Sequence, residues 1–494
     1  MVVRKIRAVL LLSLGMLATV GAFTATSTET RALAGEKPDG AKVFRAGAYA
    51  MDTTPLEFPI SVNGGMTDRL AKSAHDPMHA RCLVLDDGTT KLAIVVVDAC
   101  MIERDIFEEA KRLAQEATGI PASNMLMSAT HTHSAPTATG IFQSDSDVKY
   151  QKFLIQRIAE GVAKAHSQLE PARIGWAVGS DPTQVFNRRW KMKPGTIPPD
   201  PFGNTTDTVK MNPGYMNPGL IEPAGPVDPE VSIVSIQARD GRPIALLANY
   251  SLHYVGGAPG SMLSADYFAA FANRIGELIG ATEAKPAFVG IMSNGTSGDI
   301  NNNNYGAPAG ERKPPYGQIT FVADSVARAA YEAYKTIEYH DWVSLAAKEK
   351  DIELGVRHPG EADIARAKEI LAAAQGPVLR GLVEVYARET VLLSKYPKTV
   401  PVKLQALRIG DLGIAAIPCE TFVEIGLQLK KESPLKPTFT IELANGYNGY
   451  LPTPQQHAWG GYETWRARSS YLEVEAAPKI VETVLELLNE VAKK

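Results

Sequence analysis

The sequence lacks an excess of charge of either sign: 51 Lys and Arg residues stand against 54 Asp and Glu residues, a net charge of −3. Binding to nucleic acid phosphates needs a basic surface, so we do not expect nucleic acid to be a partner. Cysteine is also scarce. Cys82, Cys100 and Cys419 fit no zinc-finger or CxxC spacing. Each lies in or beside an apolar run, so we expect buried, inert thiols; the alternative is one disulfide with a leftover thiol in an oxidising compartment.

Long apolar runs are absent from the chain after its first residues. No later segment approaches the ~20 apolar residues of a membrane-spanning helix. The exception is Ala8 to Phe23, which follows three basic residues and precedes small ones. This order is typical of a secretory signal peptide. We expect residues 1–34 to be that peptide and the protein to be exported, to the periplasm or the medium. An N-terminal membrane anchor is the alternative, although the run is short for one.

The rest of the sequence alternates between β-branched apolar runs and amphipathic stretches. Strands are expected at 83–85, 92–97, 125–128, 231–237, 244–250, 288–292, 402–409, 412–417 and 439–443. Helices are expected at 104–116, 150–169, 265–279, 321–334, 420–431 and 478–492. This alternation predicts an α/β fold with a mixed sheet. No linker divides the chain, so residues 40–494 are expected to form a single domain. Residues 194–226 are rich in Pro, Gly and Asn and are expected to be a long irregular loop, a candidate lid.

Two histidines stand two residues apart at the end of an expected strand, in Ser128-Ala129-Thr130-His131-Thr132-His133-Ser134. Residues two apart point to the same side if the extended geometry continues. Imidazole is a common metal ligand and the commonest general base, so one ring could bind metal while the other moves protons. The pair alone is a weak signal, because paired loop histidines are often only hydrogen-bonded.

The context of this pair resembles the signature of the neutral/alkaline ceramidase family. Further segments resemble other parts of that family in the same order: Phe44–Gly47 with Asp52–Pro55, Asn187–Arg189, Asn249–His253 with Leu263–Tyr267, Pro418–Glu420, Asn445–Tyr450, and Tyr462. Each segment is short, but their order extends over nearly the whole chain. The resemblance implies a mixed-sheet, ceramidase-like catalytic domain.

The resemblance also implies a zinc site. One zinc ion per chain would be held by His131, His253, Glu420 and Tyr450. His133 would be the general base, and Arg188 and Tyr462 would stabilise the oxyanion. Two imidazoles, a carboxylate and a phenolate are reasonable donors for zinc. Without the resemblance, His253 would be interpreted as a hydrogen-bonded strand histidine and Glu420 as an acid at a helix N-terminus.

The sequence departs from the family at three places. The family hexapeptide Gly-Asp-Val-Ser-Pro-Asn becomes Gly-Asp-Ile-Asn-Asn-Asn at 298–303, so Asn301 replaces a serine that contacts the ceramide amide and hydroxyls. An asparagine still donates and accepts hydrogen bonds. Arg189 replaces a serine and adds a charge near the site. The chain is shorter than typical family members: we expect no C-terminal immunoglobulin-like domain, and a closing helix at 471–494.

Together these features predict an exported zinc-dependent amidohydrolase that attacks an amide with zinc-bound water. The substrate would be a small-molecule or lipid amide, and a lipid could be reached at a membrane surface. One alternative is a zinc hydrolase of another N-acyl or ester substrate. The other is a catalytically inactive, exported binding protein on the same scaffold. A metallo-phosphoesterase is disfavoured because the histidine pair lacks the downstream Asp of a dinuclear site. The oligomeric state is left open.

Overall fold

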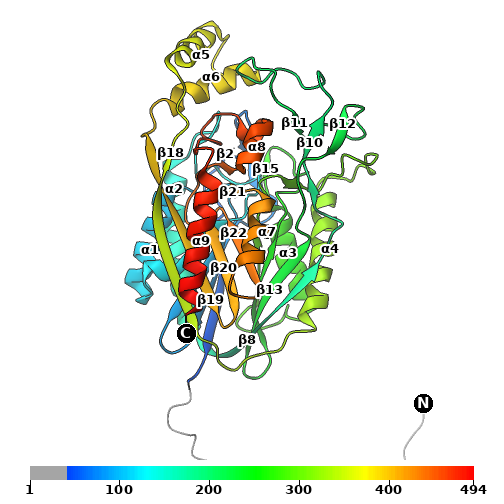
Figure 1. Ribbon diagram of the computed structural model, residues 1–494. Coiled ribbons are helices and arrows are strands. Elements are labelled where there is room, and N and C mark those ends of the chain that lie inside the picture. Colours follow the sequence, from blue (N-terminus) through cyan, green and yellow to red (C-terminus); the bar gives the residue numbers. More distant parts are fainter. Residues whose placement is uncertain (1–41, 494) are drawn as a thin grey trace, which may run out of the picture. The chain divides into compact units, whose positions relative to one another are not determined.

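Two stacked β-sheets form the centre of the protein, and helices cover their outer faces (Figure 1). The computed structural model describes residues 42–493, which belong to one compact unit. The signal peptide expected at 1–34 lies outside the described residues. The fold class expected from the sequence, α/β with mixed sheets, is confirmed.

The larger sheet has eight strands in the order β16-β14-β13-β8-β1-β5-β6-β7. In chain order these are β1 (Arg45–Asp52), β5 (His79–Asp86), β6 (Lys91–Val97), β7 (Met125–Ala129), β8 (Glu170–Ser180), β13 (Glu230–Ala238), β14 (Pro243–Tyr250) and β16 (Val289–Asn294). Only the outermost pairs, β6 with β7 and β14 with β16, are parallel. The carboxyl ends of β7 and β16 each lead into a loop of the site described below.

The smaller sheet has the order β18-β19-β20-β22. Its strands are β18 (Leu345–Gly355), β19 (Thr399–Ile409), β20 (Leu412–Ile417) and β22 (Thr438–Glu442). The parallel pair here is β20 with β22. An antiparallel bridge joins Ser128 to Ala444, so the β7 edge of the larger sheet continues toward the end of β22. This brings the loops after three parallel strand ends into one region.

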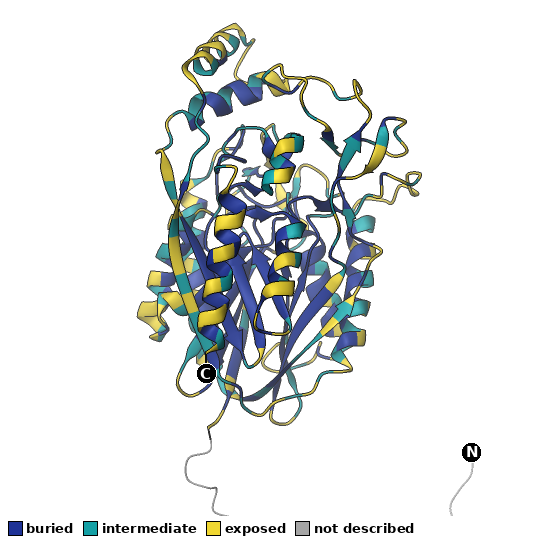
Figure 2. Ribbon diagram, in the orientation of Figure 1, coloured by how far each residue is buried: buried dark blue, intermediate teal, exposed yellow. Residues whose placement is uncertain are grey.

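Side-chain alternation along β5 explains the layers. Leu83 and Leu85 point into the core between the two sheets, with residues of β19, β20 and β22. Cys82 and Val84 point the other way, into a core shared with α1 and α2. Because successive side chains of a strand face opposite sides, a strand that is apolar throughout needs cover on both faces. Figure 2 shows the central strands buried and the outer faces of the helices exposed.

The helices are distributed over three faces. They are α1 (Arg104–Thr118) and α2 (Val148–Ser167) on one half of the larger sheet, α3 (Asp266–Leu278) and α4 (Gly317–Tyr334) on its other half, and α7 (Val423–Glu432) and α9 (Ala476–Ala492) on the smaller sheet. The hairpin of α5 (Glu361–Ala373) and α6 (Leu382–Leu393) lies between β18 and β19 in the chain, and α8 (Pro454–Trp459) follows β22. Short 3-10 turns, η1 (Ala122–Asn124) and η2 (Tyr462–Thr464), complete the helical elements of residues 42–493.

Small strand pairs build the loops above the sheets. They are β2 (Ile60–Val62) with β3 (Arg69–Ala71), β4 (Ser73–Ala74) with β15 (Met262–Leu263), β9 (Phe186–Asn187) with β17 (Ile300–Asn301), and β21 (Glu420–Thr421) with β23 (Tyr450–Leu451). A three-stranded sheet joins β10 (Arg189–Met192) to β11 (Val209–Met211) and β12 (Leu220–Pro223).

Three expectations about elements were wrong. The segment 194–226 is not wholly irregular, since β11 and β12 lie within it and pair with β10. Glu420 does not begin a helix; it lies on β21, and α7 starts at Val423. The closing helix is Ala476–Ala492, which agrees with the range 478–492 expected from the periodicity but not with a helix that starts at Tyr471. In each case pairing with a distant segment decides the local structure, and that pairing is not visible in the local pattern.

The three cysteines are buried and unpaired with one another, as expected. Within residues 42–493, no helix is long and apolar enough to cross a membrane.

Candidate active site

His131 and His253 meet in the loops after β7 and β14. Their Nε2 atoms lie 3.0 Å apart. The Nδ1 of His131 lies 2.8 Å from the carbonyl oxygen of Cys100, and the Nδ1 of His253 lies 3.0 Å from that of Ser297. A carbonyl only accepts hydrogen bonds, so each Nδ1 carries the proton. The two Nε2 lone pairs therefore face each other, an arrangement that favours a positive charge between them.

Glu420 completes this cluster from β21. Its Oε2 lies 3.2 Å from His131 Nε2 and 3.7 Å from His253 Nε2. Its Oε1 accepts a hydrogen bond from the hydroxyl of Tyr447 at 2.9 Å. Oε2 is buried and has no hydrogen-bond partner in residues 42–493. An unpartnered buried carboxylate oxygen is costly, so Glu420 is suited to hold a cation.

The separations fit a metal ion. Ligand atoms ~2.0–2.1 Å from a tetrahedral metal lie roughly 3.3 Å from one another, and the three distances in this cluster run from 3.0 to 3.7 Å. The three residues offer ligand atoms that all lie within 4.8 Å of one another. Two neutral imidazoles and a carboxylate also suit zinc chemically. The cluster can therefore hold a metal ion.

The pKa shifts of the two histidines also favour a bound cation. Burial lowers the pKa of His131, but the neighbouring Glu420 carboxylate and Cys100 raise it by more, so this pKa lies well above its ordinary value. Burial and the Arg188 guanidinium hold the pKa of His253 well below its ordinary value. The cluster thus favours one positive charge beside Glu420, which is the charge that a bound cation supplies.

Tyr450 lies beside Glu420, since the two residues are register partners in the parallel pair β21–β23. Arg188 donates a hydrogen bond from Nη2 to the Tyr450 hydroxyl oxygen at 3.1 Å and another to the Gly298 carbonyl at 2.8 Å. Tyr462, at the start of η2, packs edge-on against Tyr450 with ring centroids 5.8 Å apart. The four residues expected around the metal and the two expected to stabilise the oxyanion therefore converge.

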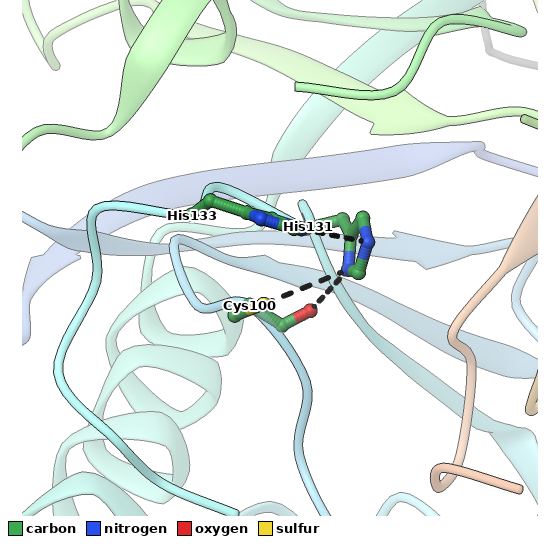
Figure 3. Close-up of side chains that lie close together, drawn as sticks. All are labelled: Cys100, His131 and His133. Atoms are coloured by element: carbon green, nitrogen blue, oxygen red, sulfur yellow. Dashed lines mark hydrogen bonds between the residues drawn. The ribbon is translucent and has the colours of Figure 1, made fainter. Parts of the chain in front are cut away.

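His133 lies on one side of the cluster, not within it. Its Nε2 is 3.1 Å from His131 Nε2 (Figure 3). The ring stacks on Tyr254 with centroids 3.7 Å apart, and Gly64 packs against its other atoms. Burial and the neighbouring His131 hold its pKa well below the ordinary value. A neutral imidazole next to a metal site has a free lone pair to accept a proton.

Asn301, on β17, is hydrogen-bonded to other asparagines. It donates to the Asn212 side chain at 2.9 Å, and its own oxygen accepts from the Asn303 amide at 2.9 Å. Both ends of the side chain are thus occupied, one by the segment after β11 and one within its own loop. Its role toward substrate stays a prediction.

Several residues of the site were missed from the sequence. They are Gly64, Cys100, Tyr254, Ser297, Glu442, Tyr447 and Glu463. Cys100 was expected only as an inert thiol, yet its carbonyl orients His131 and its sulfur lies 3.8 Å from the same ring (Figure 3). Only Tyr447 carried a sequence signal, because it belongs to the tyrosine-rich segment before Tyr450.

The fold and the site define an α/β protein with a buried His–His–Glu cluster suited to a metal. Comparison of this structure with solved structures finds proteins of similar fold. The solved structure of neutral ceramidase from Pseudomonas aeruginosa superposes with a TM-score of 0.69 at 17% identity, covering 92% of this chain and 75% of that chain. A structure described as ceramidase complexed with C2 gives 0.67 at 16% identity, covering 91% and 75%.

Sequence comparison agrees. The chain is 22% identical over 297 residues to neutral ceramidase B of Dictyostelium discoideum, covering 56% of this chain and 38% of that protein. It is 24% identical over 203 residues to neutral ceramidase A of the same organism, covering 38% and 25%. The matches thus span well under half the length of these relatives. No protein-family model matches the chain. In fold the chain is similar to the solved neutral ceramidases, and in sequence to the two neutral ceramidases of Dictyostelium discoideum, in agreement with the resemblance of its motifs.

Proposed function

We propose that this chain is a zinc-dependent amidohydrolase that cleaves an N-acyl amide of the ceramide type. One observation carries the proposal: two imidazole lone pairs and one unpartnered carboxylate oxygen converge at 3.0 to 3.7 Å in a buried site. The similarity in fold to solved neutral ceramidases supports a ceramide-type amide as the substrate class.

In this proposal His131, His253, Glu420 and Tyr450 hold one zinc ion per chain. The carbonyls of Cys100 and Ser297 fix the two rings by accepting from Nδ1. Burial and Glu420 raise the pKa of Tyr450 well above its ordinary value, and Arg188, which donates to the Tyr450 oxygen, opposes that rise. When bound, zinc supplies a Lewis acid and lowers the pKa of a coordinated water to ~7.

The remaining residues move the proton and stabilise charge. His133 Nε2 accepts the proton of the attacking water and passes it to the leaving amine. Arg188 and Tyr462 donate to the oxygen of the amide carbonyl as its charge develops. In other enzymes the loss of one such donor costs ~3–4 kcal/mol of transition-state stabilisation.

The test is metal analysis of the purified protein, together with a release assay on a fluorescent short-chain ceramide before and after chelation. Zinc near one per chain and chelator-sensitive release are expected. The variant His131→Ala should lose both zinc and activity. His133→Ala should keep zinc and lose turnover. An equal loss of zinc in both variants would show that the division of roles is wrong.

A second candidate is hydrolysis of another N-acyl or ester substrate. The engagement of both ends of the Asn301 side chain by Asn212 and Asn303 favours this candidate, because the serine at that position in the family contacts ceramide. Zinc without ceramide release would support it, and a panel of N-acyl substrates would then identify the substrate. The inactive binding protein would be supported if the protein holds no zinc.

Export is part of the proposal and rests on the N-terminal sequence pattern. Secretion of the full chain from an expression host, with loss of residues 1–34, would support it.

A further inference from the structure

The ring of Tyr254 lies against the proposed general base. It is stacked on the His133 imidazole, with ring centroids 3.7 Å apart and ring planes inclined by 15°. The centroid of the same ring lies 5.7 Å from that of His253. Two rings as close and as nearly parallel as those of Tyr254 and His133 are in van der Waals contact across their faces. Tyr254 thus covers one face of the His133 ring.

His133 needs such support more than the proposed zinc ligands do. His131 and His253 are each 1% exposed, and a backbone carbonyl accepts from Nδ1 of each ring. His133 is only half-buried. A half-buried side chain keeps rotamer freedom unless its neighbours remove it. Gly64 and Tyr254 both pack on this ring and restrict its rotation.

The backbone around Tyr254 is fixed by the start of α3. Asp266, the first residue of that helix, is 2% exposed and accepts hydrogen bonds from the amides of Val255 at 3.0 Å and Gly256 at 2.8 Å. Gly256 in turn packs on the Tyr254 ring, since a Cβ built on this glycine would lie 3.2 Å from Tyr254 Cε2. The loop therefore holds the phenol ring in place against the imidazole.

The ring of Tyr254 makes these contacts, and within residues 42–493 its hydroxyl forms no hydrogen bond. We propose that Tyr254 is a positioning residue, which keeps Nε2 of His133 directed at the proposed zinc site. That atom lies 3.1 Å from Nε2 of His131, so a rotation of the His133 ring would change the distance over which a proton moves. Tyr254 belongs to none of the motifs from which the site was predicted. The proposal rests on the proposed amidase function, in which His133 is the general base, and adds a residue to it.

The first test separates the ring of Tyr254 from its hydroxyl. Tyr254→Leu removes the stacked face, whereas Tyr254→Phe keeps that face and removes only the oxygen. With the fluorescent short-chain ceramide, kcat should fall at least tenfold in Tyr254→Leu, because a displaced catalytic group slows the chemical step. KM and zinc content should stay at the wild-type values, because neither the substrate contacts nor the metal ligands change. Tyr254→Phe should keep the wild-type kcat.

Tyr316 provides the matched control. It stacks on His75 in the same manner, with ring centroids 3.6 Å apart and planes inclined by 12°. His75 has no part in the proposed mechanism, so Tyr316→Leu should keep the wild-type kcat. The proposal is overturned if Tyr254→Leu keeps kcat, if Tyr254→Phe loses as much as Tyr254→Leu, or if lost zinc accounts for the lost activity.

An NMR measurement tests the contact without catalysis. In protein labelled with ¹³C at the histidine Cε1 atoms, the stacked phenol ring shields the Cε1 proton of His133, whose resonance the His133→Ala spectrum identifies. This resonance should move downfield in Tyr254→Leu and stay in place in Tyr254→Phe and Tyr316→Leu. A resonance that does not move in Tyr254→Leu would overturn the proposal. If it moves but the wild type releases no amine from any N-acyl substrate, the failure lies in the proposed amidase function and not in the contact between the two rings.

Discussion

Glu463 accepts hydrogen bonds from two buried arginines at once. Its Oε1 lies 3.0 Å from Arg188 Nε, and its Oε2 lies 2.5 Å from Arg189 Nη1. The Glu463 and Arg189 side chains are completely buried. Arg189 was expected to add a charge near the site. The structure pairs that charge with Glu463, and Arg189 donates further to Gln456 and to the Gly460 carbonyl. Glu463 therefore connects the guanidinium that faces Tyr450 to the turn that carries Tyr462.

The variant Glu463→Gln should destabilise the protein by about 3–5 kcal/mol, because it leaves two buried guanidinium groups without their carboxylate. Urea denaturation measures this loss. The double variant Glu463→Gln/Arg189→Met should recover part of it, since one of the two uncompensated charges is then removed. A double variant no more stable than Glu463→Gln would contradict the assigned pairing.

Gly64 packs against the His133 ring. A Cβ built on Gly64 would lie 2.4 Å from His133 Cγ, and its φ is +94°. Gly64→Ala should therefore push His133 out of place, and we expect at least a tenfold loss of kcat with zinc stoichiometry unchanged. Amide release and metal analysis on the same preparation check both parts.

Gly88 provides the matched control. Its φ is +88°, but a Cβ there would meet no atom within 4 Å. Gly88→Ala imposes the same kind of backbone strain without a contact to the site. If the two variants lose activity equally, backbone strain rather than displacement of His133 explains the effect.

The layered fold could be predicted where strands are apolar throughout. The runs that form β5, β6, β14 and β20 demand cover on both faces, and the structure supplies it. By contrast β8, with the sequence EPARIGWAVGS, contains Pro and Gly and shows no clear alternation. It is a strand because it pairs with β13 along nearly its whole length. Such pairing between distant segments cannot be inferred from local sequence.

The proposed ligands came from the order of short motifs, whereas the residues that orient them had no local signal. The carbonyl groups of Cys100 and Ser297 fix the histidine tautomers, and any residue type supplies a carbonyl. Tyr254 reaches His133 only through the path of its loop, which Asp266 holds by accepting from the amides of Val255 and Gly256. These contacts depend on the path of the backbone. The sequence therefore predicts the proposed metal ligands better than the residues that orient them.

Glu442, at the end of β22, contacts the residues that position two proposed metal ligands, His253 and Glu420. Its Oε1 accepts from Ser297 Oγ at 2.5 Å, and its Oε2 accepts from the Thr421 amide at 2.7 Å. Ser297 holds His253, and Thr421 follows Glu420. Residues that orient metal ligands typically change metal affinity 10–100-fold when substituted.

Glu442→Gln should therefore weaken zinc binding by about 10–100-fold, because one of its two acceptor oxygens becomes a donor. Competition with a chromophoric chelator measures the affinity. Glu432→Gln, at the exposed end of α7, is the control and should bind zinc as the wild type does. Unchanged affinity in a folded Glu442→Gln variant would show that Glu442 only stabilises the fold.

Lys111, on α1, is a charged residue that is buried in the protein interior. It is 1% exposed, and its Nζ has no hydrogen-bond partner among residues 42–493. Burial lowers its pKa from 10.5 to about 8, although Glu349 and Glu108 act in the opposite direction. Between pH 8 and 10.5 the unfolded chain holds this proton and the folded chain does not. The free energy of unfolding should therefore rise with pH across that window.

Replacing Lys111 by Met keeps the side-chain volume and removes the charge. At pH 7 Lys111 is protonated in both the folded and the unfolded wild type, so the folded state bears the full cost of burying its charge. Lys111→Met should therefore be more stable than the wild type by about 3 kcal/mol. The advantage should shrink as pH rises from 8 to 10.5. Denaturation curves at several pH values measure it, with Lys152→Met at an exposed position of α2 as the control. A Lys111→Met variant that is less stable than wild type at pH 7 would show that the attraction to Glu108 and Glu349 exceeds the cost of burial.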